Sequence, residues 1–356
     1  MATMLDYLAQ PRTEAPNVMP LNPVEATALA QLAYLNLDDF AQRDIPNLGV
    51  LAAMPALDNL VTGTWNEDGN RQLVRLLGRS PRFARTQILD YLNRRDLELQ
   101  QQFSVMTLRL APELYYVAFR GTRASFVDWK EDFNMTYMDA TPSQVDAARY
   151  VRHQLERYPG RFYIGGHSKG GNLAAYAYIH NSRQAQQRII SVYNLDGPGL
   201  GAPLPTGAGA VVHKLVPENS VIGMIMERTR DFSVVRSKAK GPRQHDPFTW
   251  QVDGDDFAYL PTTSALSQRA QRTINLWVDT LDDETKAAAL NAAYGIIQRT
   301  EASTLTELRS QLPRNTKLIV EALRQTDPET YGEWREVMQQ LVRALEKTRN
   351  RAEPRG

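Results

Sequence analysis

The chain has 356 residues, 42% of them hydrophobic and 23% charged, so it is long enough for one large domain or two and can bury a sizeable core. The formal net charge of +1 gives no reason to expect a nucleic-acid partner, and the lack of cysteine excludes disulfides, cysteine nucleophiles and thiolate metal sites. The N-terminus lacks a basic region followed by an apolar run, and no stretch approaches the roughly 18 apolar residues of a membrane helix. We therefore expect a soluble, cytoplasmic protein without a transmembrane segment.

Helical patterns dominate the N-terminal region, residues 1–100. Asn22 precedes Pro23 and is followed three residues later by Glu25, which is the signature of a capped helix start. Ser80 followed by Pro81 has the form of a second helix start, in the segment SPRFARTQILDYL.

The middle region, residues 101–260, alternates short apolar stretches with helical patterns. The predicted strands are 103–110, 114–119, 161–166, 188–195, 210–216 and 231–237. With a helix predicted from Thr141 to Tyr158, this pattern implies a mainly parallel sheet covered by helices. Helical patterns return over 261–356, so we predict one α/β domain over 1–356 with helical additions at both ends.

A glycine-rich turn carries the strongest chemical signal. Gly166 and Gly170 flank Ser168 in the pattern G-x-S-x-G, between a predicted strand and an alanine-rich helix. A nucleophilic serine needs small residues two before and two after it, because the chain packs tightly there, and the helix N-terminus favours a developing negative charge. A phosphate-binding loop is the weaker interpretation, since Lys169 directly follows the serine, in the wrong order for such a loop. A turn that has lost its chemistry is the other alternative.

A second glycine turn follows the predicted strand 114–119. Acyl transfer needs a second oxyanion donor from a loop after an earlier strand, and Thr122 has this position. The other donor would be the backbone N–H of Lys169. Taken alone, the Thr122 turn could equally be an ordinary strand exit in which Arg120 forms a structural ion pair.

A serine nucleophile needs a base, and histidine has a suitable pKa. The chain has five histidines: His153, His167, His180, His213 and His245. His167 adjoins the serine and is expected to pack in the turn, with its side chain pointing away from the Oγ. His245 follows the last predicted strand in a loop and fits the chain order serine, acid, histidine. Its alternative interpretation is a surface histidine.

The acid that orients the histidine has two main candidates at strand ends. Asp196 lies in NLDGPG, where glycines and proline would hold a carboxylate at the carboxyl edge of the sheet. Glu218 lies after the next strand. We prefer Asp196, although an aspartate that only caps a turn is common. Asp246 is a neighbour of His245, with a structural role more natural for it.

Several motifs together resemble a known family. FRGT followed by GGHSKGGNLA resembles the class 3 lipases and related α/β-hydrolases. MLDYL, LNPVEATALAQLAYL, GGHSKGGNLA, NLDGPG, VPENSVIG and QHDPFTW resemble, in this order, the bacterial Mbeg1-like family, and this resemblance spans most of the chain. The resemblance implies an α/β-hydrolase fold and a serine esterase or lipase-like activity. It assigns Ser168 as nucleophile, His245 as base, and Thr122 with the Lys169 N–H as oxyanion donors.

The chain departs from the class 3 lipase pattern in two places. Those lipases carry the acid in a D-x-V-P segment, where this chain has Asn219 and Ser220, so the identity of the acid stays open between Asp196 and Glu218. Lys169 replaces an apolar residue, and its cation could favour an anionic substrate or point to solvent.

The sequence therefore predicts a serine hydrolase that cleaves a small-molecule acyl ester or a lipid and needs neither a metal nor an organic cofactor. Residues 124–142 are a candidate lid, although their aromatic residues with Met135 and Met138 could equally be packing residues. A non-catalytic or regulatory protein of the same fold, an acyltransferase and a peptidase with the same triad remain alternatives.

Overall fold

The computed structural model describes residues 1–40, 45–96, 98–122, 131, 134–280 and 282–283. These residues belong to two compact units. The first unit comprises Met1–Arg95, Phe103–Gly121 and Pro142–Ser267. The second comprises the described parts of Asp96–Gln102, Thr122–Thr141 and Gln268–Gly356. Residues 124–130 and 132–133 of the candidate lid, 124–142, and most of the predicted C-terminal helical region lie outside the described residues.

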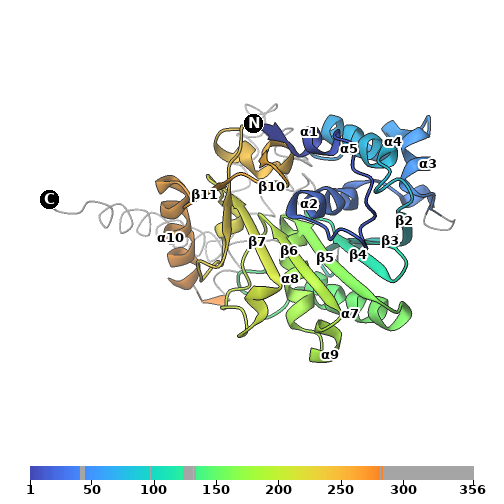
Figure 1. Ribbon diagram of the computed structural model, residues 1–356. Coiled ribbons are helices and arrows are strands. Elements are labelled where there is room, and N and C mark those ends of the chain that lie inside the picture. The colour runs from blue at the N-terminus through green and yellow to red at the C-terminus, as the bar shows by residue number, and fades with distance from the viewer. Residues whose placement is uncertain (41–44, 97, 123–130, 132–133, 281, 284–356) are drawn as a thin grey trace, which may run out of the picture. The chain divides into compact units, whose positions relative to one another are not determined.

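An eight-stranded, mainly parallel sheet forms the centre of the first unit (Figure 1). Its strands are β2 (Gln87–Asp96), β3 (Gln101–Ala111), β4 (Leu114–Phe119), β5 (Arg161–His167), β6 (Ile189–Leu195), β7 (Val212–Pro217), β8 (Ser233–Val235) and β11 (Tyr259–Leu260). Their order is β11-β8-β7-β6-β5-β4-β3-β2. Strands β4 to β8 are parallel, whereas β3 and β11 pair antiparallel at either end. The carboxyl ends of β4 to β8 therefore lie at one edge, where ligands bind in such sheets.

Helices cover both faces of this sheet. On one face, the Tyr116 hydroxyl donates to the carbonyl oxygen of Ala26 in α2 (Pro23–Gln31), 2.8 Å away, and closely covers Gly165 of β5. On the other face, Gly166 of β5 approaches α8 (Lys169–Ile179), and α7 (Pro142–Arg157) packs beside α8. Gly165 and Gly166 are successive residues of β5 and therefore point to opposite faces of the sheet, one toward the layer of α2 and the other toward α8.

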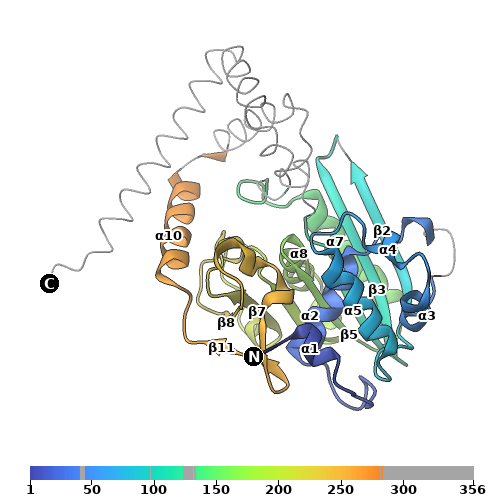
Figure 2. The ribbon, with the colours of Figure 1, turned by 90° about the horizontal axis from the view of Figure 1, so that it is seen from above.

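The N-terminal region adds a layer over α2. It contains α1 (Met4–Leu8), α3 (Leu48–Ala53), α4 (Leu57–Val61) and α5 (Glu67–Arg79). Helix α1 packs beside both α2 and α5 (Figure 2). The predicted cap of α2 is present: Asn22 accepts from the Glu25 N–H at 2.9 Å. Glu25 also forms an ion pair of 2.7 Å with Arg82, and both side chains are fully buried.

A small three-stranded sheet joins the start of the chain to a late segment. β1 (Ala2–Thr3) pairs antiparallel with β9 (Gln251–Asp253), which pairs with β10 (Asp256–Phe257). The first residues of the chain are thereby held against residues that follow His245.

The predicted helix start at Ser80 is wrong. Ser80 instead caps the C-terminus of α5, and Gln87–Asp96 form strand β2. The stretch has helix-forming composition, but Ile88 and Tyr91 are buried in the core and β2 pairs with β3. Sheet pairing and burial outweigh local propensity here.

The second unit is described over fewer residues. The Glu131 side chain is buried and accepts from the backbone N–H of Gln102 at 3.0 Å, and the Tyr137 hydroxyl donates to Asn134 at 2.7 Å. Helix α10 (Ala265–Thr280) starts in the first unit and continues into the second. Within the part of the chain that the structure describes, no helix has the length and apolar character that crossing a membrane requires.

Candidate active site

Ser168 lies at the sharp turn between β5 and α8. Its backbone angles are φ 58° and ψ −132°, a conformation that costs a residue other than glycine about 1–3 kcal/mol. Two hydrogen bonds hold the turn: the Ser168 N–H donates to Leu195 at 2.9 Å, and its carbonyl accepts from Gly171 at 2.9 Å. The turn therefore has the geometry that the G-x-S-x-G pattern predicted.

The glycines around Ser168 are required by close backbone packing. A Cβ on Gly170 would lie 2.2 Å from the carbonyl oxygen of Phe119, and one on Gly166 would lie 2.4 Å from Gly170. A Cβ on Gly121 would lie 2.4 Å from the carbonyl oxygen of His167. The end of β4 is thus pressed directly against the serine turn.

Asp196 ends β6 in a second strained turn. Its φ is 49°, its N–H donates to Leu215 at 2.7 Å, and it is almost completely buried. The Asn194 side chain accepts from the Gly197 N–H at 2.9 Å and shapes this turn. A Cβ on Gly197 would lie 2.3 Å from the Ser168 carbonyl oxygen, so the two turns pack directly on each other.

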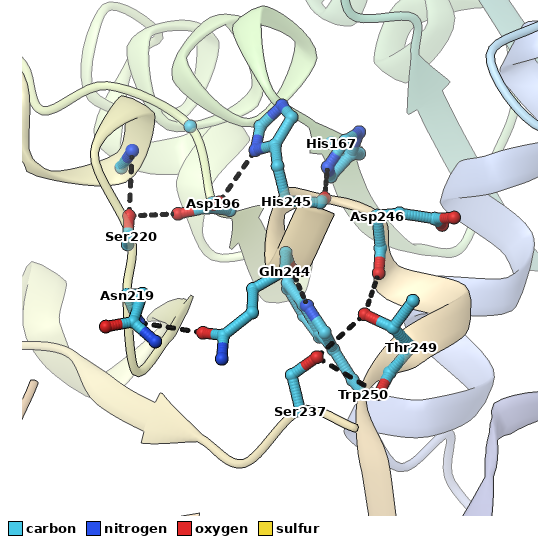
Figure 3. A network of polar contacts seen from close by, with 12 residues as sticks. His167, Asp196, Asn219, Ser220, Ser237, Gln244, His245, Asp246, Thr249 and Trp250 are labelled. Atoms are coloured by element: carbon cyan, nitrogen blue, oxygen red, sulfur yellow. Dashed lines mark hydrogen bonds and ion pairs between the residues drawn. The ribbon is translucent and has the colours of Figure 1, made fainter. Parts of the chain in front are cut away.

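His245 reaches Asp196 from the loop between β8 and β9. It ends a 3₁₀ turn, Gly241–His245, and its Nδ1 lies 2.7 Å from Oδ2 of Asp196 (Figure 3). A carboxylate only accepts, so Nδ1 carries the proton and Nε2 is the nitrogen available for proton exchange. The His245 side chain is 23% exposed, against 1% for Asp196, so the imidazole is accessible while the carboxylate is buried.

Ser220 is the further partner of Asp196. Its hydroxyl donates to Oδ1 of Asp196 at 2.5 Å and accepts from the Gly223 N–H at 3.1 Å (Figure 3). A Cβ on Gly223 would lie 2.3 Å from that same carboxylate oxygen. Each carboxylate oxygen of Asp196 thus has its own donor, one from His245 and one from Ser220.

His167 is buried beside His245. Its Nδ1 lies 3.0 Å from the Tyr34 hydroxyl, and its Nε2 lies 2.7 Å from the backbone oxygen of His245. The two imidazole rings are 4.4 Å apart between centroids. Burial, reinforced by the nearby His245, lowers the pKa of His167 well below its usual value, so the ring is neutral. His167 packs in the turn, as the sequence predicted.

The other candidate acids and bases occupy different surroundings. Glu218 contributes its backbone to the end of β8, through its N–H to Val235 at 3.2 Å. Asp246 caps a 3₁₀ turn by accepting from Phe248, and it also accepts from Asn66 at 2.8 Å. The remaining histidines, His153, His180 and His213, are all exposed.

A buried ion pair lies close to the acid. Nζ of Lys214, on β7, is 2.6 Å from Glu227. Burial lowers the pKa of Lys214, although Glu227 and Asp196 oppose this effect by their negative charges. Lys214 and Glu227 therefore form a pair of opposite charges that compensate each other inside the protein.

The predicted oxyanion donors belong to different units. The Lys169 N–H is the first of α8, at the positive end of the helix dipole, while Thr122 is the first residue of the second unit after β4. The Lys169 side chain is 1% exposed, so it does not point to solvent. Among the described residues, no group of three His, Asp or Glu side chains could hold a metal ion.

Sequence reasoning missed Tyr34 and the role of Ser220. Tyr34 lies in LNPVEATALAQLAYL, 133 residues before His167, and this motif predicts a helix but no contact with the serine turn. Ser220 stands near the position at which class 3 lipases carry their acid, but this position does not indicate a contact with Asp196. In both cases the partner is distant in sequence, so only the folded chain reveals the contact.

The α/β-hydrolase fold predicted from the sequence is confirmed. The structure has a mainly parallel sheet covered by helices, a strained serine between a strand and a helix, and an aspartate at the end of the next strand. A histidine follows on a later loop, in the expected chain order.

Three solved structures have detectable similarity to this one. The native Rhizomucor miehei lipase propeptide complex is 16% identical, with 68% of this chain and 74% of that chain covered and a TM-score of 0.35. A fungal lipase–inhibitor complex, described as a model for interfacial activation in lipases, is 16% identical, with 62% and 89% covered and a TM-score of 0.34. M37 lipase is 16% identical, with 55% and 67% covered and a TM-score of 0.33.

At the sequence level, no curated protein matches the chain. The profile of the Mbeg1-like family matches residues 77–295, which is more than half of the chain and includes Ser168, Asp196 and His245. The chain therefore belongs to the Mbeg1-like family.

Proposed function

We propose that this chain is a serine hydrolase that cleaves carboxylic esters through an acyl-enzyme on Ser168. One observation carries the proposal: the buried Asp196 carboxylate is bonded to Nδ1 of His245 in a turn that packs on the Ser168 backbone. A strained serine, a histidine and a buried acid in this chain order are the groups that acyl transfer requires.

In the first half-reaction, the Ser168 hydroxyl attacks the ester carbonyl carbon and forms a C–O bond. Nε2 of His245 takes the hydroxyl proton, because Nδ1 is engaged by Asp196. The negative charge of Asp196 stabilises the imidazolium that forms. The tetrahedral intermediate then expels the alcohol, which leaves with the proton from His245.

In the second half-reaction, water attacks the acyl-serine. His245 takes a proton from the water and returns it to the Ser168 oxygen as the carboxylic acid leaves. The protein starts and ends in the same state, so protein groups alone suffice and no cofactor is required.

The oxyanion of both intermediates would be held by backbone donors. The Lys169 N–H follows the nucleophile at the start of α8, where the helix dipole favours negative charge. Thr122 is assigned as the second donor on its sequence position and on the family resemblance. Removal of such a donor from an acyl-transfer enzyme costs about 10²- to 10³-fold in rate.

The substrate class that fits this chemistry is a small-molecule acyl ester or a lipid. Acyl transfer to another alcohol and hydrolysis of a peptide use the same groups, so they differ only in the acceptor and the leaving group. Competition with an added alcohol or amine, measured from the product ratio, separates acyl transfer from hydrolysis.

The test is the hydrolysis of p-nitrophenyl esters of increasing acyl chain length. We expect turnover by the wild type and none above background by Ser168→Ala, with the preferred length reporting the size of the acyl site. Equal rates for the two proteins at every chain length would contradict the proposal.

A further inference from the structure

The loop that carries His245 is held by the N-terminal region at three places. β1 pairs with β9, which follows the loop, through Ala2 with Val252 and Thr3 with Gln251. Asn66 and Tyr34 make the other two connections, close to His245 itself. Both residues precede the segment that the family profile matches, which begins at residue 77.

The first connection near the base passes through His167. A backbone carbonyl only accepts, so Nε2 of His167 must carry a proton to bond the oxygen of His245, 2.7 Å away. The ring is buried and neutral, so Nδ1 is then an acceptor, and the Tyr34 hydroxyl donates to it over 3.0 Å. Tyr34 thus selects the tautomer in which His167 can hold the backbone of His245.

Tyr34 is itself fixed in place. It ends the 3₁₀ turn Leu32–Tyr34 directly after α2 and is only 4% exposed. A Cβ on Gly121 would lie 2.3 Å from its hydroxyl oxygen, which shows how closely the end of β4 packs on it. Close packing therefore holds the Tyr34 hydroxyl in the position from which it bonds His167.

The second connection near the base is made by Asn66, the N-cap of α5. Its Oδ1 accepts from the Gly69 N–H at 2.8 Å, and its Nδ2 donates to Asp246 at 2.8 Å. The other oxygen of Asp246 accepts from Phe248 at 3.0 Å. One amide therefore links the start of α5 to the residue that follows His245.

We propose that Tyr34 and Asn66 are positioning residues for His245, supplied by the N-terminal region outside the family-matched segment. One holds the backbone of His245 through His167, and the other holds the next residue along the chain. Together they hold two consecutive residues of the loop, His245 and Asp246. The catalytic part of this inference rests on the proposed function of His245 as the base.

The test uses two variants, each with a matched control. Tyr34→Phe removes only the hydroxyl, and Tyr116→Phe removes an equally buried hydroxyl whose bond goes to Ala26. Asn66→Ser retains a helix-capping oxygen but loses the link to Asp246. Asn47→Ser makes the same change at the cap of α3, where Asn47 accepts from Val50.

The first measurement is the steady-state hydrolysis of a short p-nitrophenyl ester. We expect kcat to fall about tenfold in Tyr34→Phe and in Asn66→Ser, the effect of one lost hydrogen bond, with KM unchanged. The two controls are expected to keep the wild-type kcat. A wild-type kcat in both test variants would overturn the proposal.

The second measurement does not depend on activity. The His245 Nδ1 proton, bonded to Asp196, can be followed by NMR, and we expect it to exchange with solvent at least about tenfold faster in the test variants than in their controls. Equal exchange in tests and controls would overturn the positioning role. Faster exchange in the test variants, together with a wild type that is no more active than Ser168→Ala, would support the positioning role of Tyr34 and Asn66 and reject the proposed function instead.

Discussion

Nδ1 of His245 lies 2.7 Å from the carboxylate of Asp196, across 49 residues of sequence. Asp196 is buried and held in a left-handed conformation, while His245 is partly exposed. The contact therefore joins a fixed, desolvated acid to an accessible imidazole. That asymmetry is what a base needs from its orienting partner, because the acid sets the tautomer while the other ring nitrogen stays reachable.

Replacing the acid tests which carboxylate orients His245. Asp196→Asn is expected to lower kcat for a short p-nitrophenyl ester by about 10³- to 10⁴-fold, because an amide can donate to Nδ1 and stabilise the wrong tautomer. Glu218→Gln is the matched control, and we expect it to retain the wild-type rate. The opposite pattern, with loss only in Glu218→Gln, would show that the acid is Glu218.

Removing the Ser220 hydroxyl, the second hydrogen-bond donor to Asp196, should lower kcat less than replacing Asp196 does. Ser220→Ala deletes the hydroxyl that donates to Oδ1 of Asp196, and a hydrogen bond to a charged group accounts for about a 10- to 100-fold fall in kcat. Ser220→Thr keeps the hydroxyl and should restore most of the rate. Ser237→Ala is the control, since the Ser237 hydroxyl bonds Thr249 at 2.8 Å. Equal kcat in Ser220→Ala and Ser237→Ala would contradict this role.

The buried neutral His167 makes stability depend on pH. Its folded-state pKa lies well below 6.5, whereas the unfolded chain binds a proton there as pH falls past that value. The free energy of unfolding is therefore lost as pH drops below about 6.5, by up to about 1.4 kcal/mol per pH unit from this one group.

Urea denaturation at several pH values checks this expectation. His167→Gln should show a shallower decline between pH 6.5 and pH 5 than the wild type, even if its stability at pH 8 is lower. The exposed His180 provides the control, and His180→Gln should keep the wild-type slope. Parallel curves for the wild type and His167→Gln would mean that folding does not lower the pKa of His167.

Close packing at the serine turn predicts that Gly170 cannot be enlarged. In Gly170→Ala the new Cβ would meet the carbonyl oxygen of Phe119 at 2.2 Å, and we expect the free energy of unfolding to fall by about 1–3 kcal/mol. Gly209→Ala is the control, because no atom lies within 4 Å of a Cβ there. Equal stability of the two variants, measured by thermal unfolding, would contradict the packing described for the turn.

Much of the sheet could be predicted from sequence because its signals are local. The strands predicted at 103–110, 114–119 and 161–166 correspond to β3, β4 and β5 within two residues at each end. The cap at Asn22 was equally readable, since capping depends on residues three positions apart. β2 was not, because its partner strand and the core decide its conformation.

The candidate site likewise has some parts that could be predicted from sequence and others that could not. The serine turn has a sequence pattern because its steric needs are met by adjacent glycines, and the positions of Asp196 and His245 follow from chain order in such sheets. Sequence alone left the acid open between Asp196 and Glu218, and only the folded chain places Asp196 against His245. Tyr34 and Asn66 are linked to His245 through His167 and Asp246, which lie far along the chain, and no local spacing encodes these contacts.

The central claim is that Ser168 is a nucleophile activated by His245, and covalent labelling tests it most directly. A fluorophosphonate probe should modify the wild type at one site, mapped to Ser168 by mass spectrometry of the digested protein. Ser168→Ala should not be labelled at all, and His245→Ala should be labelled far more slowly. A wild type that takes up no probe, or that is labelled to the same extent as Ser168→Ala, would contradict the account.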